Sequence, residues 1–285
     1  VHTDFEIIAS GTKDCRYYEH NNIKYIKVDI TQKKDFDKLP KDDVYAVVDL
    51  AGFMPARMKG YDPYKYIDVN ITGNLNILEF CRKNHVSKIL LKPDMKPDFS
   101  YNTDHTIYVM TKNFTVDMIK NYNQMYGISA FIFRLPTIYL YSKTDTYFVD
   151  GEERKIGYRL LIDNAIEGKD IEIWGDKTRK KDMVYVKDFC QMMYKALISD
   201  IKFGHYNVGT GVGTSLEKQI EGIIDVFSDG VHKSKIIERK DKQNSPQYIM
   251  DIQNAKDELG YEPKYNYIEM LKDLKREMNE KRFDC

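Results

Sequence analysis

Tyr108 and Lys112 could together carry out proton chemistry, because residues four apart lie on one face of a helix and reach a common ligand. A phenol has an ordinary pKa near 10, so its pKa must fall by about 3 for it to act as a base at pH 7, which requires roughly 4 kcal/mol. A neighbouring ammonium supplies charge of the sign that lowers it. The spacing predicts a tyrosine base activated by a lysine; the alternative is an exposed tyrosine and lysine on an ordinary helix.

The same spacing occurs at Tyr61/Lys65 and Tyr139/Lys143, and among 22 tyrosines about two or three such pairs are expected by chance. Their surroundings separate the three pairs. Pro63 lies inside the first of these two pairs, and the second follows a strand into a polar loop. The pair at residues 108 and 112 opens an amphipathic helix that precedes a buried strand. It is therefore the candidate site.

The elements that must position this pair follow from apolar runs of four to seven residues that alternate with segments of helical period. Strands are predicted at residues 5–9, 24–28, 44–50, 87–91 and 130–135. Helices are predicted at residues 70–84 and 108–125. This alternation indicates βαβ units, so we predict an α/β fold with a doubly wound, Rossmann-like parallel sheet. Its ligand crevice is expected at the carboxyl ends of the strands.

The rhythm changes after Arg134, where a polar loop leads into mixed short elements. Thr214 and Glu217 have the spacing of a capping box and predict the start of a helix. Further helical stretches are predicted near residues 156–166, 188–197, 253–259 and 267–278. We therefore predict a smaller, interleaved C-terminal α/β domain for the substrate. The predicted division assigns residues 1–139 and 182–204 to the sheet domain, and residues 140–181 and 205–285 to the substrate domain.

The composition excludes several classes of partner. Forty-four Lys and Arg residues balance 44 Asp and Glu residues, so no global field attracts nucleic acid or an anionic membrane. No apolar run approaches the roughly 18 residues that a membrane-spanning helix needs. The cysteines, Cys15, Cys81, Cys190 and Cys285, form no C-x-x-C pair. No metal site is therefore expected, and a reducing cytoplasm fits this usage best.

Several segments form an ordered series along the chain. They are VVDLAGFMPA, DVNITGNLNILEFCRKNHVSKILL, the Tyr108/Lys112 pair, FIFRLPTIY, GDKTRKKDMVYVKDF, HYNVGTG and DELGYEP. In this order they resemble the landmarks of the extended short-chain dehydrogenases, the NAD(P)-dependent epimerases and dehydratases that act mostly on nucleotide sugars. The series covers nearly the whole sequence, and its order is far more specific than any single motif.

The resemblance implies a role for each matching residue. Tyr108 becomes the general base, and Lys112 both lowers the pKa of the tyrosine and holds the nicotinamide ribose. The remaining cofactor contacts that it implies are Asp29 and Ile30 near the adenine, Leu50, Ala51 and Gly52 at a strand end, and Pro136 and Ile138 beside the nicotinamide. The alternatives are a helix N-cap for the aspartate, close packing for the strand end, and ordinary strand-to-loop packing for the last two.

On the substrate side, the resemblance implies that Arg179 and Lys181 grip a diphosphate. Lys181 stands where the family usually has Arg, and an ammonium lacks the two-pronged fork of a guanidinium. The alternative is a solvated basic turn. The implied chemistry is reversible oxidation of a sugar carbinol on a nucleotide sugar, in a homodimer.

The choice of dinucleotide depends on the first predicted strand. No acidic residue closes FEIIAS, where Asp or Glu would bind a ribose 2′-hydroxyl, and Lys13 and Arg16 follow it. The cofactor is therefore predicted to be NAD or NADP, with a slight preference for NADP.

Three departures from the family pattern stand out. The glycine-rich turn that cradles the pyrophosphate should precede FEIIAS, where only four residues stand. Lys92-Pro93-Asp94 occupies the place of a Ser/Thr residue, and the segment before Tyr108 is short. The segment TIYLY replaces a Gly-Pro turn. We expect the first two gaps to reflect residues of a longer chain. The contrary hypothesis is a catalytically degenerate member that serves as a binding or regulatory module.

Overall fold

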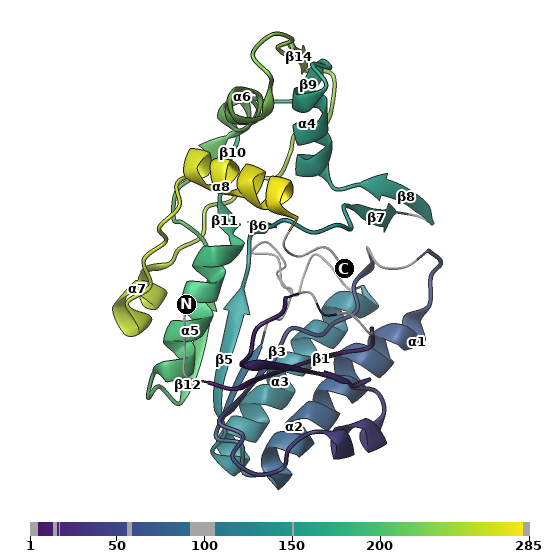
Figure 1. Cartoon of the computed structure of the whole chain (residues 1–285), viewed down its shortest axis with the longest axis vertical. Helices are drawn as coiled ribbons and strands as arrows, with labels where there is room; N and C mark the ends of the chain where they lie inside the picture. Colours follow the sequence, from purple (N-terminus) through teal and green to yellow (C-terminus); the bar gives the residue numbers. More distant parts are fainter. Residues whose placement is uncertain are drawn as a thin grey trace.

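The structure is a computed structural model that describes residues 5–13, 16, 18–55, 59–91, 106–149 and 151–281. Figure 1 shows a lower part built on parallel strands and an upper part in which helices dominate. Among the residues described, no helix is long and apolar enough to cross a membrane.

A four-stranded parallel sheet forms the centre of the lower part, in the order β12, β5, β4, β3. Its strands are β3 (Ala46–Asp49), β4 (Lys88–Leu91), β5 (Ser129–Arg134) and β12 (Phe203–Asn207). Every residue of β4 is buried, as are the first five residues of β5. Parallel strands have this burial when helices cover both faces of the sheet.

Alternate residues of these strands serve two separate cores. Ile89 and Ile132 pack with one pair of helices, whereas Leu90 and Phe131 pack with another pair on the opposite face. The first pair is α2 (Asn74–Lys83) and α3 (Ile107–Tyr126), and the second is α5 (Val186–Ile198) and α7 (Gln253–Leu259). This arrangement confirms the predicted doubly wound α/β fold.

Two predicted strands lie outside this sheet. β1 (Ile7–Gly11) and β2 (Ile23–Lys27) form a parallel pair of their own, and a 3-10 helix, η1 (Lys33–Lys38), follows. Within the described ranges, β3 pairs with β4 and with no other strand. Burial follows this division, since Ile7 is 46% exposed and Val48 of β3 is 45% exposed. The strands predicted for the first 135 residues are thus divided between two sheets.

The upper part has its own core and a small sheet. β9 (Ile171–Trp174) pairs in parallel with β14 (Ile236–Arg239). The helices around it are α4 (Gly157–Ile166), α6 (Leu216–Phe227) and α8 (Tyr267–Glu280), which share one apolar cluster. The single tryptophan of the chain, Trp174, ends β9 and is 52% exposed, with the ammonium of Lys242 5.5 Å from its ring centroid.

Short strand pairs link the two parts. β6 (Thr137–Tyr139) continues from β5 and pairs in parallel with β11 (Met183–Tyr185). The other pairs are β7 (Thr146–Val149) with β8 (Glu152–Lys155), and β10 (Lys180–Lys181) with β13 (Thr214–Ser215).

The predicted start of helix α6 at Thr214 is wrong. Thr214 lies in β13, and the N-cap is Ser215, whose hydroxyl accepts from the backbone N–H of Lys218. A hydroxyl one residue further on therefore satisfies the first turn.

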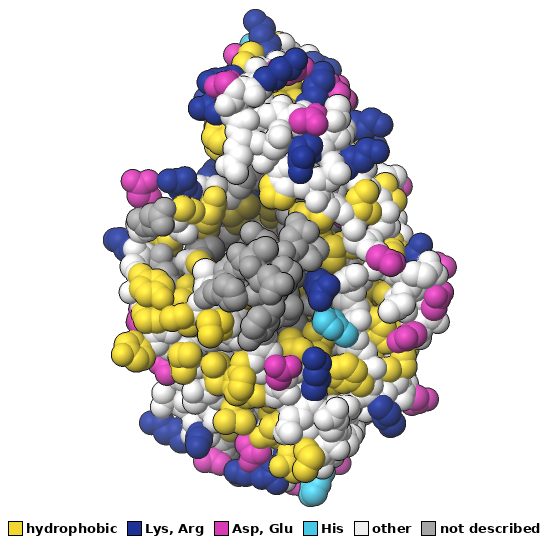
Figure 2. Space-filling view, turned by 180° about the vertical axis from the view of Figure 1, so that it is seen from behind, with side chains coloured by type: hydrophobic (Ala, Val, Ile, Leu, Met, Phe, Trp, Pro, Cys, Tyr) yellow, Lys and Arg dark blue, Asp and Glu magenta, His cyan; other side chains and the backbone are white. Residues whose placement is uncertain are grey.

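Residues beyond position 204 also contribute to the lower core. Tyr206, Val208 and Met250 belong to the same cluster as Leu90 of β4. We therefore propose that the sheet domain also includes residues 205–208 and the segment from Met250 to Tyr261. Figure 2 shows a related difference on the back face, where apolar side chains gather over the lower part and Lys and Arg gather at the upper end.

Candidate active site

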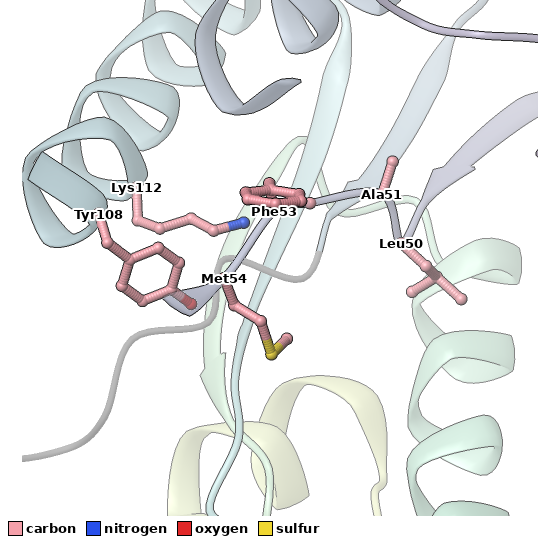
Figure 3. A pocket seen from close by; sticks show the side chains of 7 residues that line it. Leu50, Ala51, Phe53, Met54, Tyr108 and Lys112 are labelled. Carbon is pink, nitrogen blue, oxygen red and sulfur yellow. The ribbon is translucent and has the colours of Figure 1, made fainter. Parts of the chain in front are cut away.

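Helix α3 positions Tyr108 and Lys112 at its first two turns. Thr106 is the N-cap, and its hydroxyl accepts from the N–H of Val109. The side chains of Tyr108 and Lys112 point to the same side of the helix in Figure 3, with the ammonium 6.0 Å from the phenol ring centroid. The helix ends at Gly127, which has φ of 69° and no Cβ to strain there.

These two side chains meet the chain that leaves the carboxyl end of β3. A small cavity of about 30 Å³ is lined by Leu50, Ala51, Gly52, Phe53, Met54, Tyr108 and Lys112 (Figure 3). Five residues predicted from the sequence therefore come together at the edge where ligands of doubly wound sheets bind. Their individual roles stay predictions.

The glycine at position 52 lets the ammonium reach this edge. A Cβ atom on Gly52 would lie 2.7 Å from Nζ of Lys112, which is closer than such atoms approach. Lys112 is 5% exposed, so its head group has little room to move aside. A side chain at position 52 would therefore displace the ammonium from the cavity.

Asn70 holds the loop of residues 50–54, which faces α3 across the cavity. It lies in the π-helical segment η3 (Tyr66–Gly73), which continues from the short helix α1 (Pro63–Lys65) into α2. Its side-chain oxygen accepts from the N–H of Phe53 at 2.8 Å, and its amide nitrogen donates to the carbonyl of Phe53 at 2.9 Å. Both backbone groups of Phe53 are thus satisfied by one buried side chain.

Two threonines of α3 join Asn70 to the helix that carries Tyr108 and Lys112. The amide of Asn70 also donates to the hydroxyl of Thr111, which in turn donates to the carbonyl of Tyr108 at 2.8 Å. The hydroxyl of Thr115 donates to the carbonyl of Asn70 at 2.7 Å. The loop of residues 50–54 and the first turns of α3 therefore share one hydrogen-bonded network.

A buried carboxyl lies beside the cavity at the end of β3. Asp49 is 5% exposed, and its Oδ1 accepts from the N–H of Ala51 at 2.8 Å. Burial raises the pKa of Asp49 to about 6, although the Ala51 N–H and the positive charge of Lys112 act in the opposite direction. The ammonium of Lys112 therefore favours the ionised form of this carboxyl.

Aromatic rings cover the side of Tyr108. Its ring centroid lies 5.9 Å from that of Tyr66, which lies a further 5.9 Å from that of Phe53. Burial raises the pKa of Tyr66, so this neighbour remains a neutral phenol. The ring of Tyr66 therefore lies directly against that of Tyr108, and the ring of Phe53 lies behind it.

Sequence reasoning missed Asn70, Thr111 and Asp49. Asn70 stands in an otherwise helical, largely apolar run, and a polar amide there is a signal of a buried hydrogen bond. Asp49 closes an apolar strand, which is the position where a carboxyl would face the crevice. Neither signal identifies the partner, because Phe53 is 17 residues from Asn70.

The predicted adenine contacts lie outside the cavity. Oδ1 of Asp29 accepts from both the N–H and the hydroxyl of Thr31, which forms a local turn just after β2. The N-cap position of η1 is Gln32, so the alternative of a helix N-cap for Asp29 is wrong. The side chain of Ile30 fills the space in front of Gly73.

The other predicted cofactor residues are also outside the small cavity. Pro136 is buried, and Ile138 is half-buried in β6 and packs against the core that contains Leu135. Lys13 and Arg16 are exposed beyond the end of β1.

The predicted diphosphate residues form part of a strand pair. Lys181 is half-buried in β10, and Nε of Arg179 donates to the carbonyl of Ser245 at 2.6 Å. The segment pairs with β13, and both the diphosphate role and the alternative of a solvated basic turn stay predictions. Lys92, Pro93 and Asp94, which stand in place of the family's hydroxyl residue, lie outside the described residues.

Doubly wound α/β proteins bind their ligands, dinucleotides among them, at the carboxyl edge of the sheet, and this chain holds Tyr108 and Lys112 there. Within this class the match is specific. The model described as "NAD dependent epimerase/dehydratase family" matches residues 3–209, and the chain belongs to that family.

Curated relatives include an epimerase and a dehydratase. The chain is 26% identical over 265 residues to UDP-glucuronate 4-epimerase of Thermodesulfobacterium geofontis, which covers 88% of this chain and 78% of the relative. It is 24% identical over 237 residues to dTDP-glucose 4,6-dehydratase of Escherichia coli, which covers 72% of this chain and 64% of the relative.

Solved structures share the fold over most of the chain. UDP-glucose 4-epimerase of Thermotoga maritima, solved with UDP-glucose, superposes with a TM-score of 0.76 at 19% identity, covering 97% of this chain and 92% of that one. UDP-glucuronic acid 4-epimerase of Bacillus cereus, solved with NAD, gives 0.67 at 20% identity, covering 91% and 82%.

Proposed function

We propose that the protein is an NAD-dependent 4-epimerase of a UDP-sugar. The observation that carries this proposal is the cavity in which Tyr108 and Lys112 face the strand end of residues 50–52. Family membership and the names of the relatives above support the substrate class and the reaction.

Tyr108 takes the proton of the sugar hydroxyl at its phenol oxygen and returns it after the sugar carbon has been reduced again. The charge of Lys112 stabilises the phenolate that this requires, and burial of the lysine keeps water from screening that charge. Thr111 and Asn70 hold the helix and the loop at a fixed separation. Asp49 moderates the positive charge of the cavity.

The strand end at residues 50–52 fits a dinucleotide, because glycine at 52 leaves the ammonium of Lys112 facing the edge of the sheet. When bound, the dinucleotide supplies the hydride chemistry. We propose Asp29 and Ile30 for its adenosine side, and Pro136 and Ile138 for its nicotinamide side.

NAD is the dinucleotide that we propose, because the Bacillus cereus structure is a complex with NAD. The affinity for NADP should be measured as well, because Lys13 and Arg16 follow the first strand and could favour NADP. Arg179 and Lys181 are proposed to contact the diphosphate of the sugar nucleotide.

A homodimer is proposed from apolar side chains that helix α3 leaves in solvent. Met110 is 54% exposed and Phe114 is 51% exposed, and they lie one turn apart. A charge at this position should separate two copies, so Phe114→Glu is expected to reduce the mass seen by light scattering from that of a dimer to that of a monomer.

The function is tested by calorimetric titration with NAD and NADP and by turnover of UDP-glucose and UDP-glucuronate. Tyr108→Phe is expected to lower turnover by about 10²-fold or more while NAD affinity stays within a few fold. Tyr61→Phe is the matched control, since Tyr61 has a lysine at the same spacing and is 74% exposed. Near-normal turnover by Tyr108→Phe would remove the tyrosine from the mechanism. Dinucleotide binding without turnover of any UDP-sugar would favour the degenerate binding module.

A further inference from the structure

A second cavity, which we call the α8 cavity, lies where helix α8 begins. Its volume is about 310 Å³, compared with about 30 Å³ for the cavity beside Tyr108, and the two share no lining residue. The lining comes from β11, from residues 210–214 and from residues 263–270, which lead into α8. Figure 1 shows α8 beside β11 in the upper part. A cavity of this size is large enough for a small organic molecule.

The buried lining of the α8 cavity is apolar. Met183 of β11 is 6% exposed and Met270 of α8 is 2% exposed. Tyr265 and Tyr267 are half-buried beside them. The hydroxyl of Tyr267 donates to a backbone carbonyl of α6 at 2.9 Å, so the rest of this side chain contributes an apolar ring. Methionine and tyrosine side chains together favour a ligand with an apolar ring.

Two charged residues line the exposed part of the cavity, and they differ in how their charge is compensated. Glu269 is the third residue of α8, and its Oε2 accepts from the backbone N–H of Asn266 at 2.9 Å in a capping box. The helix N-terminus also stabilises this carboxylate. Lys264, in contrast, forms no ion pair with the residues that the structure describes. The buried carboxyl of Asp188 accepts the backbone N–H of Lys264 at 2.8 Å. The ammonium is therefore available to an anion.

The hydroxyl of Thr214 is a further polar group of the lining. Within the described ranges it has no hydrogen-bond partner, whereas the hydroxyl of Thr210 donates to Asp182 at 2.6 Å. Thr214 lies in β13 and pairs with Lys181 of β10. One wall of the α8 cavity is thus the strand pair that carries a residue proposed for the diphosphate.

We infer that the α8 cavity binds an organic anion in which one acidic group is attached to an apolar ring. The ring occupies the space beside Met183, Met270 and the two tyrosines. The acidic group meets Lys264, whose flexible ammonium suits a single carboxylate or sulfonate. Thr214 supplies an additional hydrogen-bond donor. The inference does not rest on the proposed function, because none of these residues lines the cavity of Tyr108.

The probe is 8-anilinonaphthalene-1-sulfonate, whose fluorescence rises when its rings enter an apolar site. Wild type is titrated in the presence of NAD and UDP, which compete for the candidate active site, and saturable binding is expected. Lys264→Glu replaces attraction by repulsion and should weaken binding by about fivefold or more. Lys256→Glu is the matched control, because Lys256 is an exposed lysine of α7 outside the cavity and should leave the affinity unchanged.

A neutral probe separates charge from shape. N-phenyl-1-naphthylamine has the same rings without the sulfonate, so its affinity for Lys264→Glu should stay within about twofold of that for wild type. If Lys264→Glu unfolds, Lys264→Ala takes its place and should weaken sulfonate binding by about threefold. Equal affinity of the lysine variant and wild type for the sulfonate would overturn the inference.

A bulky substitution tests the location. Val212 lines the cavity and is 66% exposed, so Val212→Phe adds volume at its mouth without burying a larger side chain in the core. Both probes should bind this variant about fivefold or more weakly. Val231→Phe is the control, since Val231 is 77% exposed and lies outside the cavity. Unchanged binding by Val212→Phe, or no saturable binding by wild type, would reject the site. Failure of NAD and UDP to bind would instead count against the proposed function.

Discussion

β4 and β1 are both short apolar parallel strands, yet they are in opposite environments. Every residue of β4 is buried between helices, whereas four of the five residues of β1 are exposed, and among the described strands β1 pairs with β2 alone. Both strands contain adjacent large aliphatic residues, Ile89 to Leu91 in β4 and Ile7 and Ile8 in β1, and the environment of each strand decides how much they contribute. The comparison teaches that an apolar run predicts a strand but not how much that strand stabilises the fold.

The largest expected effect comes from isoleucines in the two sheets. Ile132 of β5 is fully buried, so Ile132→Ala should lower the free energy of unfolding by about 4 kcal/mol. Ile8 of β1 is 36% exposed, so Ile8→Ala should cost less than about 1 kcal/mol. Urea unfolding followed by circular dichroism measures both. Equal losses would show that the two sheets contribute alike.

A second effect concerns charge at the end of β3. The raised pKa of Asp49, about 6 against an ordinary 3.8, means that the folded state holds its proton more tightly than the unfolded state. The contribution of Asp49 to the free energy of unfolding is therefore fully present below about pH 4 and is lost as the pH rises through 6. The loss amounts to about 3 kcal/mol.

Asp49→Asn keeps the acceptor for the Ala51 N–H and removes the charge. It should be more stable than wild type by up to about 3 kcal/mol at pH 7.5 and nearly equal to it at pH 4. Asp42→Asn, at an exposed position before β3, should change neither value. A pH-independent effect of Asp49→Asn would contradict the assignment.

A third, smaller effect is expected from loss of the hydrogen bonds that Asn70 makes to the loop beside the cavity. Asn70→Ala leaves the N–H and carbonyl of Phe53 without partners, at a cost of about 2 kcal/mol. The loop of residues 50–54 should loosen, so affinity for NAD should fall with stability. Asn22→Ala, exposed just before β2, should alter neither. Chemical unfolding measures the stability, and calorimetric titration measures the affinity for NAD. An Asn70→Ala variant with wild-type values of both would contradict the role proposed for this hydrogen-bond network.

The smallest expected effect is a difference in native-state hydrogen exchange between the two sheets. Amides of β4 and β5 should exchange only through global unfolding, whereas those of β1 and β2 should exchange through local opening, at least about tenfold faster. Mass spectrometry of peptides from the two regions measures the difference. Uniform protection would mean that both sheets unfold as one unit.

Periodicity and motif order were sufficient to predict the buried strands, helix α3 and the meeting of Tyr108 and Lys112 with residues 50–52. They failed where an interaction depends on a distant partner. Asn70 bonds to Thr111 across 41 positions, and the capping residue of α6 is displaced by one residue from the expected threonine.

The position of Trp174 has a consequence for spectroscopy. Since it is the sole indole and lies half in solvent on β9, emission excited beyond the absorption of the 22 tyrosines reports the environment of the upper core. A fluorescence melt would follow α4, α6 and α8 and would be blind to loss of the β4–β5 region. A gap between emission and far-ultraviolet dichroism transitions would therefore reveal two cooperative units in a single chain.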